Sequence, residues 1–229
     1  MPGTLGHAMS FSGDDAAGEG NDKPETESRA DWDIRIEAET DLPDDARNWL
    51  HAHQNAVGDV AMLIARRLHL GRALSAAIGR AAAYHDIGKL SIPSDILCKP
   101  GRLTAEEYAV IRSHSLLGHD MLSQNEGRLA PLAARVALHH HEAMDGSGYP
   151  NGLKGNEIPL EARIVGVADV YDALREDRPY RQGVSHDRAM AILLEGDDRT
   201  WPAKFCPKVL RAFEDCQEDI ARSWRLCNA

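Results

Sequence analysis

A histidine followed directly by an aspartate, His85-Asp86, closes an alanine-rich stretch in the middle of the chain. The pair offers a cation a neutral nitrogen and a charged oxygen from adjacent positions, and the two oxygens of Asp86 could each contact a different cation. Lys89 follows about one helical turn later, so its ammonium group can reach the same cleft, and Gly88 lets a ligand or backbone come close. Alone, such a pair is more often a surface or capping pair, so its meaning depends on what the fold brings to it.

Apolar residues recur at helical spacing from Pro43 onward, which predicts an all-α fold of about seven or eight helices and no convincing sheet. Thr104 with Glu107 forms a capping box, and Ser185 suits the N-cap of a later helix. The predicted helices run from Pro43 to Leu68, Leu74 to His85, Thr104 to about Ser123, Leu129 to Glu142, Ala162 to Leu174, Ser185 to Leu194 and Pro207 to about Trp224.

Acidic charge is concentrated at the front of the chain. Residues 1–47 contain 13 acidic and 4 basic side chains, whereas residues 48–229 contain 23 and 22. Residues 1–30 have too few large apolar groups to offset chain entropy, so we expect a disordered acidic tail. Residues 31–40 alternate apolar and polar side chains, as a short strand or an extended segment on the core would. We therefore assign residues 31–47 to an extended lead-in and residues 48–229 to one folded domain.

The composition argues against several classes of function. No basic stripe suggests binding to duplex nucleic acid. The four cysteines lack CxxC spacing and fit reduced thiols. No apolar run approaches the roughly 18 residues that span a bilayer, and the front lacks a signal pattern. We expect a soluble, cytoplasmic protein without a receiver or sensor domain, and leave its regulation and oligomeric state open.

Side chains that ligate metals occur on several of the predicted helices. Each has an ordinary alternative, such as a core histidine, a surface histidine or an ion-paired aspartate, but together they indicate one common centre. Imidazoles with carboxylates suit iron, manganese, zinc or nickel better than magnesium or calcium. Two cations about 3.5–4 Å apart are a standard arrangement for phosphoester hydrolysis. The candidate residues are His53, His85, Asp86, His114, His140, His141 and Asp169.

Seven segments of the sequence resemble, in order, the motifs of the HD-GYP subgroup of the HD metal-dependent phosphohydrolases. They are His85–Lys89, Lys99–Thr104, His114–Gly118, His140–Pro150, Ile158–Leu160, Ala168–Leu174 and Arg178–Arg181. The resemblance covers about residues 48–215. It implies an all-α fold with a di-iron or related centre, alternatively with manganese. It also implies hydrolysis of cyclic di-GMP to linear pGpG, in some members onward to GMP.

The resemblance further implies a role for each matching residue. One metal would be held by His53, His85, Asp86 and Asp169, and the other by Asp86, His114, His140 and His141, with Asp86 bridging. Lys89 would contact phosphate and assist the leaving oxygen. Gly148 and Tyr149 would shape the wall of the substrate pocket, and Arg178 and Arg181 would hold phosphates. His139 is expected to be a bystander, and Asp172 either supports a ligand from behind or is a solvated carboxylate.

Three positions depart from the pattern of the family. Trp49 stands where some members have a glutamate for a third metal, so we expect two metals and weak conversion of pGpG to GMP. Ala56 and Ala143 replace frequent basic residues, which lowers the expected substrate affinity. An alternative is therefore a catalytically weak receptor for a cyclic dinucleotide, or a module that docks a cyclase through the Gly148–Pro150 loop. A third hypothesis keeps the enzyme but changes the substrate to another nucleotide.

Overall fold

The computed structural model describes residue 34, residues 40–177 and residues 182–227. Within these ranges the protein is all-helical and contains no strand, as predicted. The disorder predicted for residues 1–30 falls outside the described residues. Of the lead-in predicted to be extended, residues 31–47, the structure describes Ile34, which is buried in the core, and residues 40–47.

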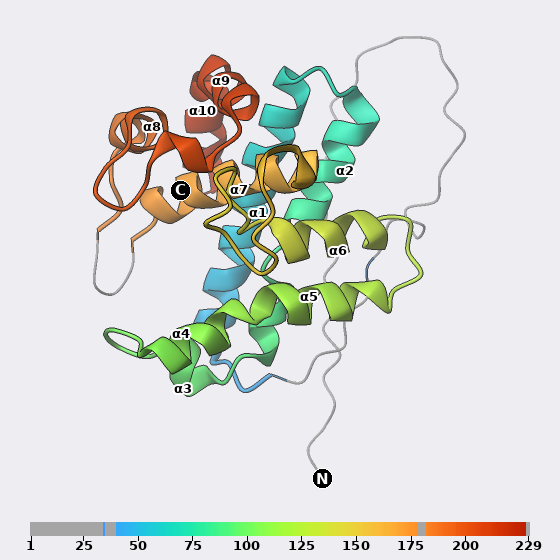
Figure 1. Ribbon diagram of the computed structural model, residues 1–229, viewed down its shortest axis with the longest axis vertical. Helices are drawn as coiled ribbons and strands as arrows, with labels where there is room; N and C mark the ends of the chain where they lie inside the picture. The colour runs from blue at the N-terminus through green and yellow to red at the C-terminus, as the bar shows by residue number, and fades with distance from the viewer. Residues whose placement is uncertain (1–33, 35–39, 178–181, 228–229) are drawn as a thin grey trace.

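The described chain forms ten α-helices, more than the seven or eight predicted, joined in part by short 3-10 helices (Figure 1). The α-helices are α1 (Asp44–Arg67), α2 (Arg72–Ala82), α3 (Ser94–Leu97), α4 (Ala105–Arg112), α5 (His114–Ser123), α6 (Ala130–His139), α7 (Leu160–Arg175), α8 (His186–Glu195), α9 (Pro207–Asp215) and α10 (Gln217–Cys227). The 3-10 helices are η2 (Ile87–Ser91), η3 (Gly155–Glu157) and η4 (Pro202–Lys204). Because α1 begins at Asp44, residues 44–47 of the expected lead-in are helical rather than extended.

Two predicted helices are each divided in two. The third breaks at Ser113, where the backbone N–H and the hydroxyl both donate to the carbonyl oxygen of Val110, at 3.1 and 2.7 Å. A serine that bonds its own backbone competes with regular helix bonding. The last predicted helix breaks at Cys216, whose φ is −114°. The first break makes His114 the opening residue of α5.

Two other helices end before the predicted residue. The second ends at Ala82 rather than His85, because Tyr84 and His85 donate to carbonyls only three residues back, each at 3.0 Å. The fourth ends at His139 rather than Glu142. Both changes place ligand-type residues in turns that follow helices, where the chain can direct successive side chains into one site.

Helix α1 lies at the centre of the fold and contacts α2, α7, α9 and α10 (Figure 1). Its crossing with α2 is close, since a Cβ on Gly58 would stand 2.8 Å from the carbonyl oxygen of Gly79. Val57 and Ile64 are fully buried on the face that makes these contacts. The burial of α1 carries His53 into the interior of the protein.

A second close approach joins η2 to α5, which itself packs on α6. A Cβ on Gly88 would stand 2.0 Å from the carbonyl oxygen of His114 and 2.5 Å from the backbone nitrogen of Gly118. Only glycine fits there, so the expected close approach at Gly88 is made by backbone. It brings the turn with His85 and Asp86 against the start of α5. None of the helices within the described ranges combines the length and apolar character needed to cross a membrane.

Candidate metal centre

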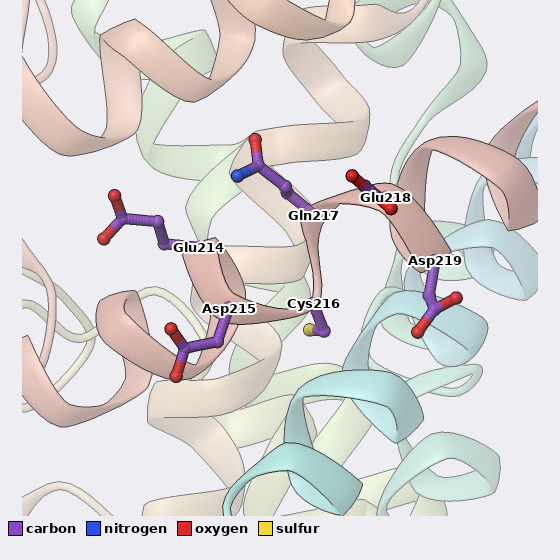
Figure 2. A pocket seen from close by; sticks show the side chains of 6 residues that line it. All are labelled: Glu214, Asp215, Cys216, Gln217, Glu218 and Asp219. Carbon is purple, nitrogen blue, oxygen red and sulfur yellow. The ribbon is translucent and has the colours of Figure 1, made fainter.

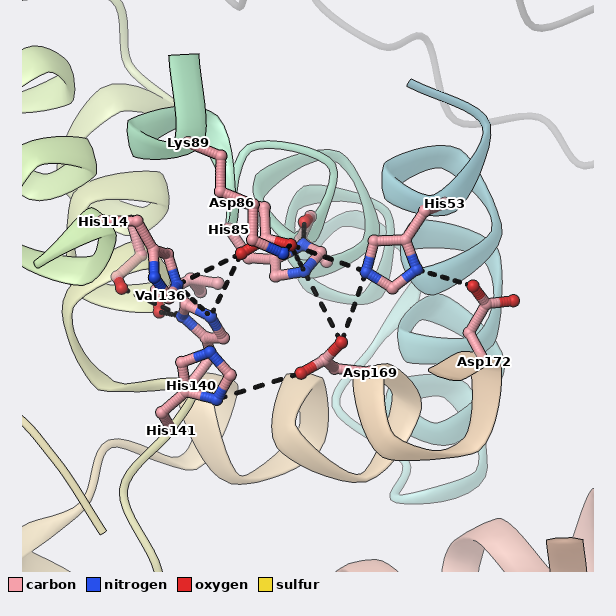
Figure 3. A network of polar contacts seen from close by, with 12 residues as sticks. His53, His85, Asp86, Lys89, His114, Val136, His140, His141, Asp169 and Asp172 are labelled. Atoms are coloured by element: carbon pink, nitrogen blue, oxygen red, sulfur yellow. Dashed lines mark hydrogen bonds and ion pairs between the residues drawn. The ribbon is translucent and has the colours of Figure 1, made fainter. Parts of the chain in front are cut away.

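All seven predicted ligand residues meet in one cluster, in which five are buried and His141 and Asp169 are partly exposed (Figure 3). His53 comes from α1, His114 from α5 and Asp169 from α7, while the other four come from the turns after α2 and α6. Two groups share Asp86 and have their ligand-type atoms within 4.8 Å of one another: His53, His85 and Asp86, and Asp86, His114, His140 and His141.

The two oxygens of Asp86 face different histidines. Oδ2 lies 3.6 Å from Nε2 of His53 and 3.3 Å from Nε2 of His85. Oδ1 lies 3.2 Å from Nε2 of His114 and 3.7 Å from Nε2 of His140. The carboxylate therefore joins two half-sites, which is the geometry a bridging ligand requires. The first half-site contains His53 and His85, and the second contains His114, His140 and His141.

Asp169 adds a second carboxylate, mainly to the first half-site. Its Oδ1 is 3.3 Å from Nε2 of His53 and 3.8 Å from Nε2 of His85. Its Oδ2 is 4.0 Å from Nδ1 of His141, on the other side of the cluster. Both half-sites thus combine imidazole and carboxylate ligands.

Four of the histidines are oriented by hydrogen bonds from Nδ1. In His85, His114 and His140 this nitrogen lies 2.8, 2.7 and 2.9 Å from a backbone carbonyl oxygen of the preceding turn. In His53 it lies 2.6 Å from Oδ2 of Asp172. A proton on Nδ1 leaves the lone pair of Nε2 free, and the four Nε2 atoms are the ones that point into the cluster.

Some enclosed atoms of the cluster lack a hydrogen-bond partner. Nε2 of His85 and Oδ1 of Asp86 are buried without one. Buried polar atoms are nearly always satisfied, and a divalent cation would satisfy both of these. The donor set of imidazole and carboxylate groups fits iron, manganese or zinc.

The electrostatics of the site keep the two carboxylates charged. Burial opposes the charge, but Lys89 and His85 hold the pKa of Asp86 well below its usual range. Burial also raises the pKa of Asp169, but the hydrogen bond to His53 and the charges of His85, His53 and His141 together lower it. Burial lowers the pKa of His140 to about 4, so this imidazole is neutral and able to ligate at pH 7.

His53 differs from His140 in the direction of its pKa shift. Burial again disfavours its charged form, but the hydrogen bonds to Asp169 and Asp172 raise its pKa to about 10. A proton on Nε2 is thus held between carboxylates at neutral pH. A cation at Nε2 can take the place of this proton and interact with the same negative charges.

Lys89 lies at the edge of the cluster. Its Nζ forms an ion pair with Oδ2 of Asp86, as the spacing predicted, and stands 5.9 Å from the ring centroid of Trp49. The Trp49 ring stacks on His53 with centroids 5.8 Å apart. Trp49, which stands where some family members have a glutamate, therefore forms an aromatic wall beside the first half-site.

The Gly148–Pro150 loop lies against the second half-site. A Cβ on Gly148 would stand 2.3 Å from the backbone nitrogen of Ala143, so a glycine is required there. The Tyr149 ring stacks on His141 at 4.6 Å, and the guanidinium of Arg112 lies 4.3 Å from its centroid. Glu142 anchors the loop by accepting from the backbone N–H groups of residues 151 and 153 at 2.7 and 2.9 Å.

The remaining residues that the sequence analysis named have different outcomes. Arg178 and Arg181 lie outside the described residues, so their phosphate-binding role stays a prediction. His139 is in neither half-site and lies 3.9 Å from Glu142, in line with the role of a bystander. Asp172, for which two roles were open, is 3 % exposed and contacts His53, so it lies behind a candidate ligand and is not a solvated carboxylate. Ala56 and Ala143 are both buried.

A surface hollow at the turn between α9 and α10 is distinct from this cluster (Figure 2). It has a volume of about 480 Å³ and contains none of the predicted site residues. Four of its six lining residues are acidic: Glu214, Asp215, Glu218 and Asp219. Such a lining repels a phosphodiester, so it does not compete with the histidine–aspartate cluster as a substrate site.

An all-helical domain with a buried, two-part histidine–aspartate cluster defines this protein as one of the HD type. The model of the HD domain family matches residues 37–201, so the chain belongs to that family. Its motifs, together with the relatives below, place it in the HD-GYP subgroup.

The chain is 45% identical over 152 residues to the cyclic di-GMP phosphodiesterase response regulator RpfG of Xanthomonas campestris, covering 66% of this chain and 40% of that one. It is 38% identical over 159 residues to 3′3′-cGAMP-specific phosphodiesterase 2 of Vibrio cholerae, covering 68% and 30%. The chain thus spans less than half the length of these relatives. Among solved structures, Bd1817, an HDG"Y"P protein from Bdellovibrio bacteriovorus, matches 74% of this chain and 52% of that one with a TM-score of 0.57 and 18% identity, which supports the fold.

Proposed function

We propose that the protein hydrolyses a phosphodiester bond of cyclic di-GMP and releases linear pGpG, which lowers the level of this second messenger. The observation that carries the proposal is the division of the two Asp86 oxygens between two sets of histidines. Cyclic di-GMP is the substrate named for RpfG, and the shared motifs support the same class of substrate here. Two divalent cations, iron or alternatively manganese, would be the cofactors.

The ligand set that we propose follows the two half-sites. His53, His85 and Asp169 would hold one cation, His114, His140 and His141 the other, and Asp86 both. Cations bound there supply Lewis acidity that lowers the pKa of water and neutralises phosphoryl charge. The Nδ1 hydrogen bonds keep the histidine Nε2 atoms directed inward, so little reorganisation is needed.

The residues around the cations would bind and orient the substrate. Lys89 would donate a hydrogen bond to a phosphoryl oxygen and protonate the 3′ oxygen as it leaves. Gly148 would set the position of Tyr149, which covers His141 and forms a wall of the pocket. Arg178 and Arg181 would hold phosphates. Trp49 stands where some family members have a glutamate for a third metal. We therefore expect two cations rather than three, and pGpG as the main product.

The test is an anaerobic assay of the purified protein supplied with Fe(II) or Mn(II). Cyclic di-GMP and 3′3′-cGAMP are added separately, and products are resolved by chromatography while bound metal is counted. We expect pGpG from the wild type and none from Asp86→Asn, because the amide cannot bridge two cations with charged oxygens. Asp120→Asn, an exposed carboxylate with 71 % of its side chain accessible, is the matched control.

Other outcomes favour the alternative functions. Intact substrate with two cations bound overturns the proposal. Tight binding of cyclic di-GMP without turnover would favour a receptor, for which the uncharged Ala56 and Ala143 are the motivation. In that function the Gly148–Pro150 loop would dock a cyclase or another signalling protein, a partner that stays a prediction. Preferred cleavage of 3′3′-cGAMP would change the substrate, in line with the Vibrio cholerae relative.

A further inference from the structure

The carboxylate of Asp172 is held by two elements that are far apart in the sequence. Its Oδ2 lies 2.6 Å from Nδ1 of His53 on α1, and its Oδ1 accepts a hydrogen bond from Nε1 of Trp224 on α10 at 2.9 Å. Figure 3 shows Asp172 approaching His53 from the side away from Asp169. Each oxygen of this buried carboxylate therefore has a nitrogen partner.

Holding both oxygens matters for the orientation of His53. A carboxylate that accepts from Nδ1–H fixes the tautomer and the ring plane of a metal-ligating histidine. The terminal torsion of an aspartate is broad, so one contact leaves the carboxylate free to rock. The indole N–H can only donate, so Trp224 can hold the second oxygen without competing for His53.

The ring of Trp224 makes a second contact that bears on the same region. The guanidinium carbon of Arg175 lies 4.1 Å from the ring centroid. Nη1 of Arg175 in turn donates to the carbonyl oxygen of Val184 at 3.1 Å, and Val184 donates to Leu174 at 2.9 Å. These bonds join the end of α7 to Val184, which lies just before α8. The ring of Trp224 therefore packs against the arginine that links the end of α7 to Val184.

Trp224 lies outside the part of the chain that the family comparison covers. The match to the HD domain model ends at residue 201, whereas α10 spans Gln217–Cys227. Helix α10 packs on α1, and Ile220 is fully buried in the core. The helix is thus anchored next to the helix that carries His53, and its indole N–H is presented to the carboxylate behind that ligand.

We propose that Trp224 is a positioning residue of the metal centre, acting through Asp172 on His53. The inference rests on the proposed metal centre. The N–H of the indole contacts Asp172, whereas the ring face contacts Arg175. A substitution that removes only the N–H therefore tests the positioning role by itself.

Trp224→Phe removes the N–H but retains an aromatic ring. Trp201→Phe is the matched control, because Trp201 also donates from Nε1 to an aspartate, Asp145, at 2.9 Å, but away from His53. Anaerobic titration of Mn(II) against a competing chelator gives the affinity at each site. We expect Trp224→Phe to weaken one of two sites about tenfold, the lower end of the usual effect of losing such support. Trp201→Phe should leave both affinities unchanged.

A double-mutant cycle distinguishes loss of the hydrogen bond to Asp172 from a general loosening of α10 by the substitution. In an Asp172→Asn background the indole N–H has lost its charged acceptor, so Trp224→Phe should cause little further loss of Mn(II) affinity. Fully additive losses, or wild-type affinity at both sites in Trp224→Phe, would overturn the inference. If the wild type itself binds no pair of cations, the proposed metal centre fails and the inference fails with it.

Discussion

At the scale of single residues, Asp86 determines the character of the site. A buried carboxylate is costly without compensation, and here Lys89 and the surrounding imidazoles keep it ionised. Its two oxygens face different histidines, so one side chain supports both half-sites. Among the lysines of the described ranges, Lys89 is the one that forms an ion pair with Asp86. Its role can be separated from metal binding, because it is not itself a ligand.

We expect Lys89→Met to retain two cations but to lose hydrolysis of cyclic di-GMP by about 10²–10³-fold, the usual effect of removing a donor aimed at developing charge. Metal counting and steady-state kinetics on the same sample provide the check. Lys99→Met, which removes a lysine paired with Glu107 instead, should change the rate little. Loss of metal from Lys89→Met would show that the lysine acts on Asp86 rather than on the substrate.

At the scale of secondary-structure elements, close backbone approaches at glycines hold the half-sites together. Gly88 lets η2 lie against the start of α5, and Gly58 and Gly79 let α1 lie against α2. A Cβ on Gly79 would stand 2.8 Å from Cβ of Met62 and 2.9 Å from the carbonyl oxygen of Gly58. The separation of α1 from α2 sets the distance between His53 and His85, so packing at these glycines affects the site directly.

Gly79→Ala should therefore lower the free energy of unfolding by about 1–3 kcal/mol, the usual cost of overpacking, despite the better helix propensity of alanine. Urea unfolding measures this change. Leu74→Ala on the same helix, where the leucine is 46 % exposed, should stay within about 0.5 kcal/mol of the wild type. An unchanged midpoint for Gly79→Ala would mean that the two helices can separate without cost.

At the scale of the whole molecule, the site joins segments from one end of the domain to the other. Ligand-type residues come from α1, α5, α7 and two turns, and Asp172 adds a contact to α10. Cations bound at such a centre would crosslink these elements in the folded state only. Binding that is confined to the folded state stabilises the fold in proportion to the logarithm of ligand excess over Kd.

Removal of metal should consequently destabilise the entire domain. At a hundredfold excess of metal over Kd, one site contributes about 2.7 kcal/mol. Unfolding of the wild type by heat, with Mn(II) and then with a chelator, should show a lower Tm after chelation. Asp86→Asn should unfold at the same temperature in both conditions. A wild-type Tm that does not respond to the chelator would contradict a metal centre inside the folded core.

The helical class and the capping box at Thr104 followed from the sequence, because they depend on local periodicity and on side-chain chemistry. The sequence also named seven candidate ligand residues, which the structure brings together, and their role as metal ligands stays a prediction. The predicted ends at His85 and Glu142 were too late, and the breaks at Ser113 and Cys216 were missed, because short backbone bonds within a turn leave little trace in an apolar pattern.

Tertiary structure alone decided the pairings across the chain. His53 and Asp172 are separated by 119 positions, and Asp172 and Trp224 by 52, so no local spacing could relate them. The open question about Asp172 was settled by the packing of α7 and α10 around α1. The close approach at Gly88 places the start of α5, with His114, against the turn that carries Asp86. Side-chain type specifies what a residue can bind, but only the packing of distant helices specifies which partners it meets.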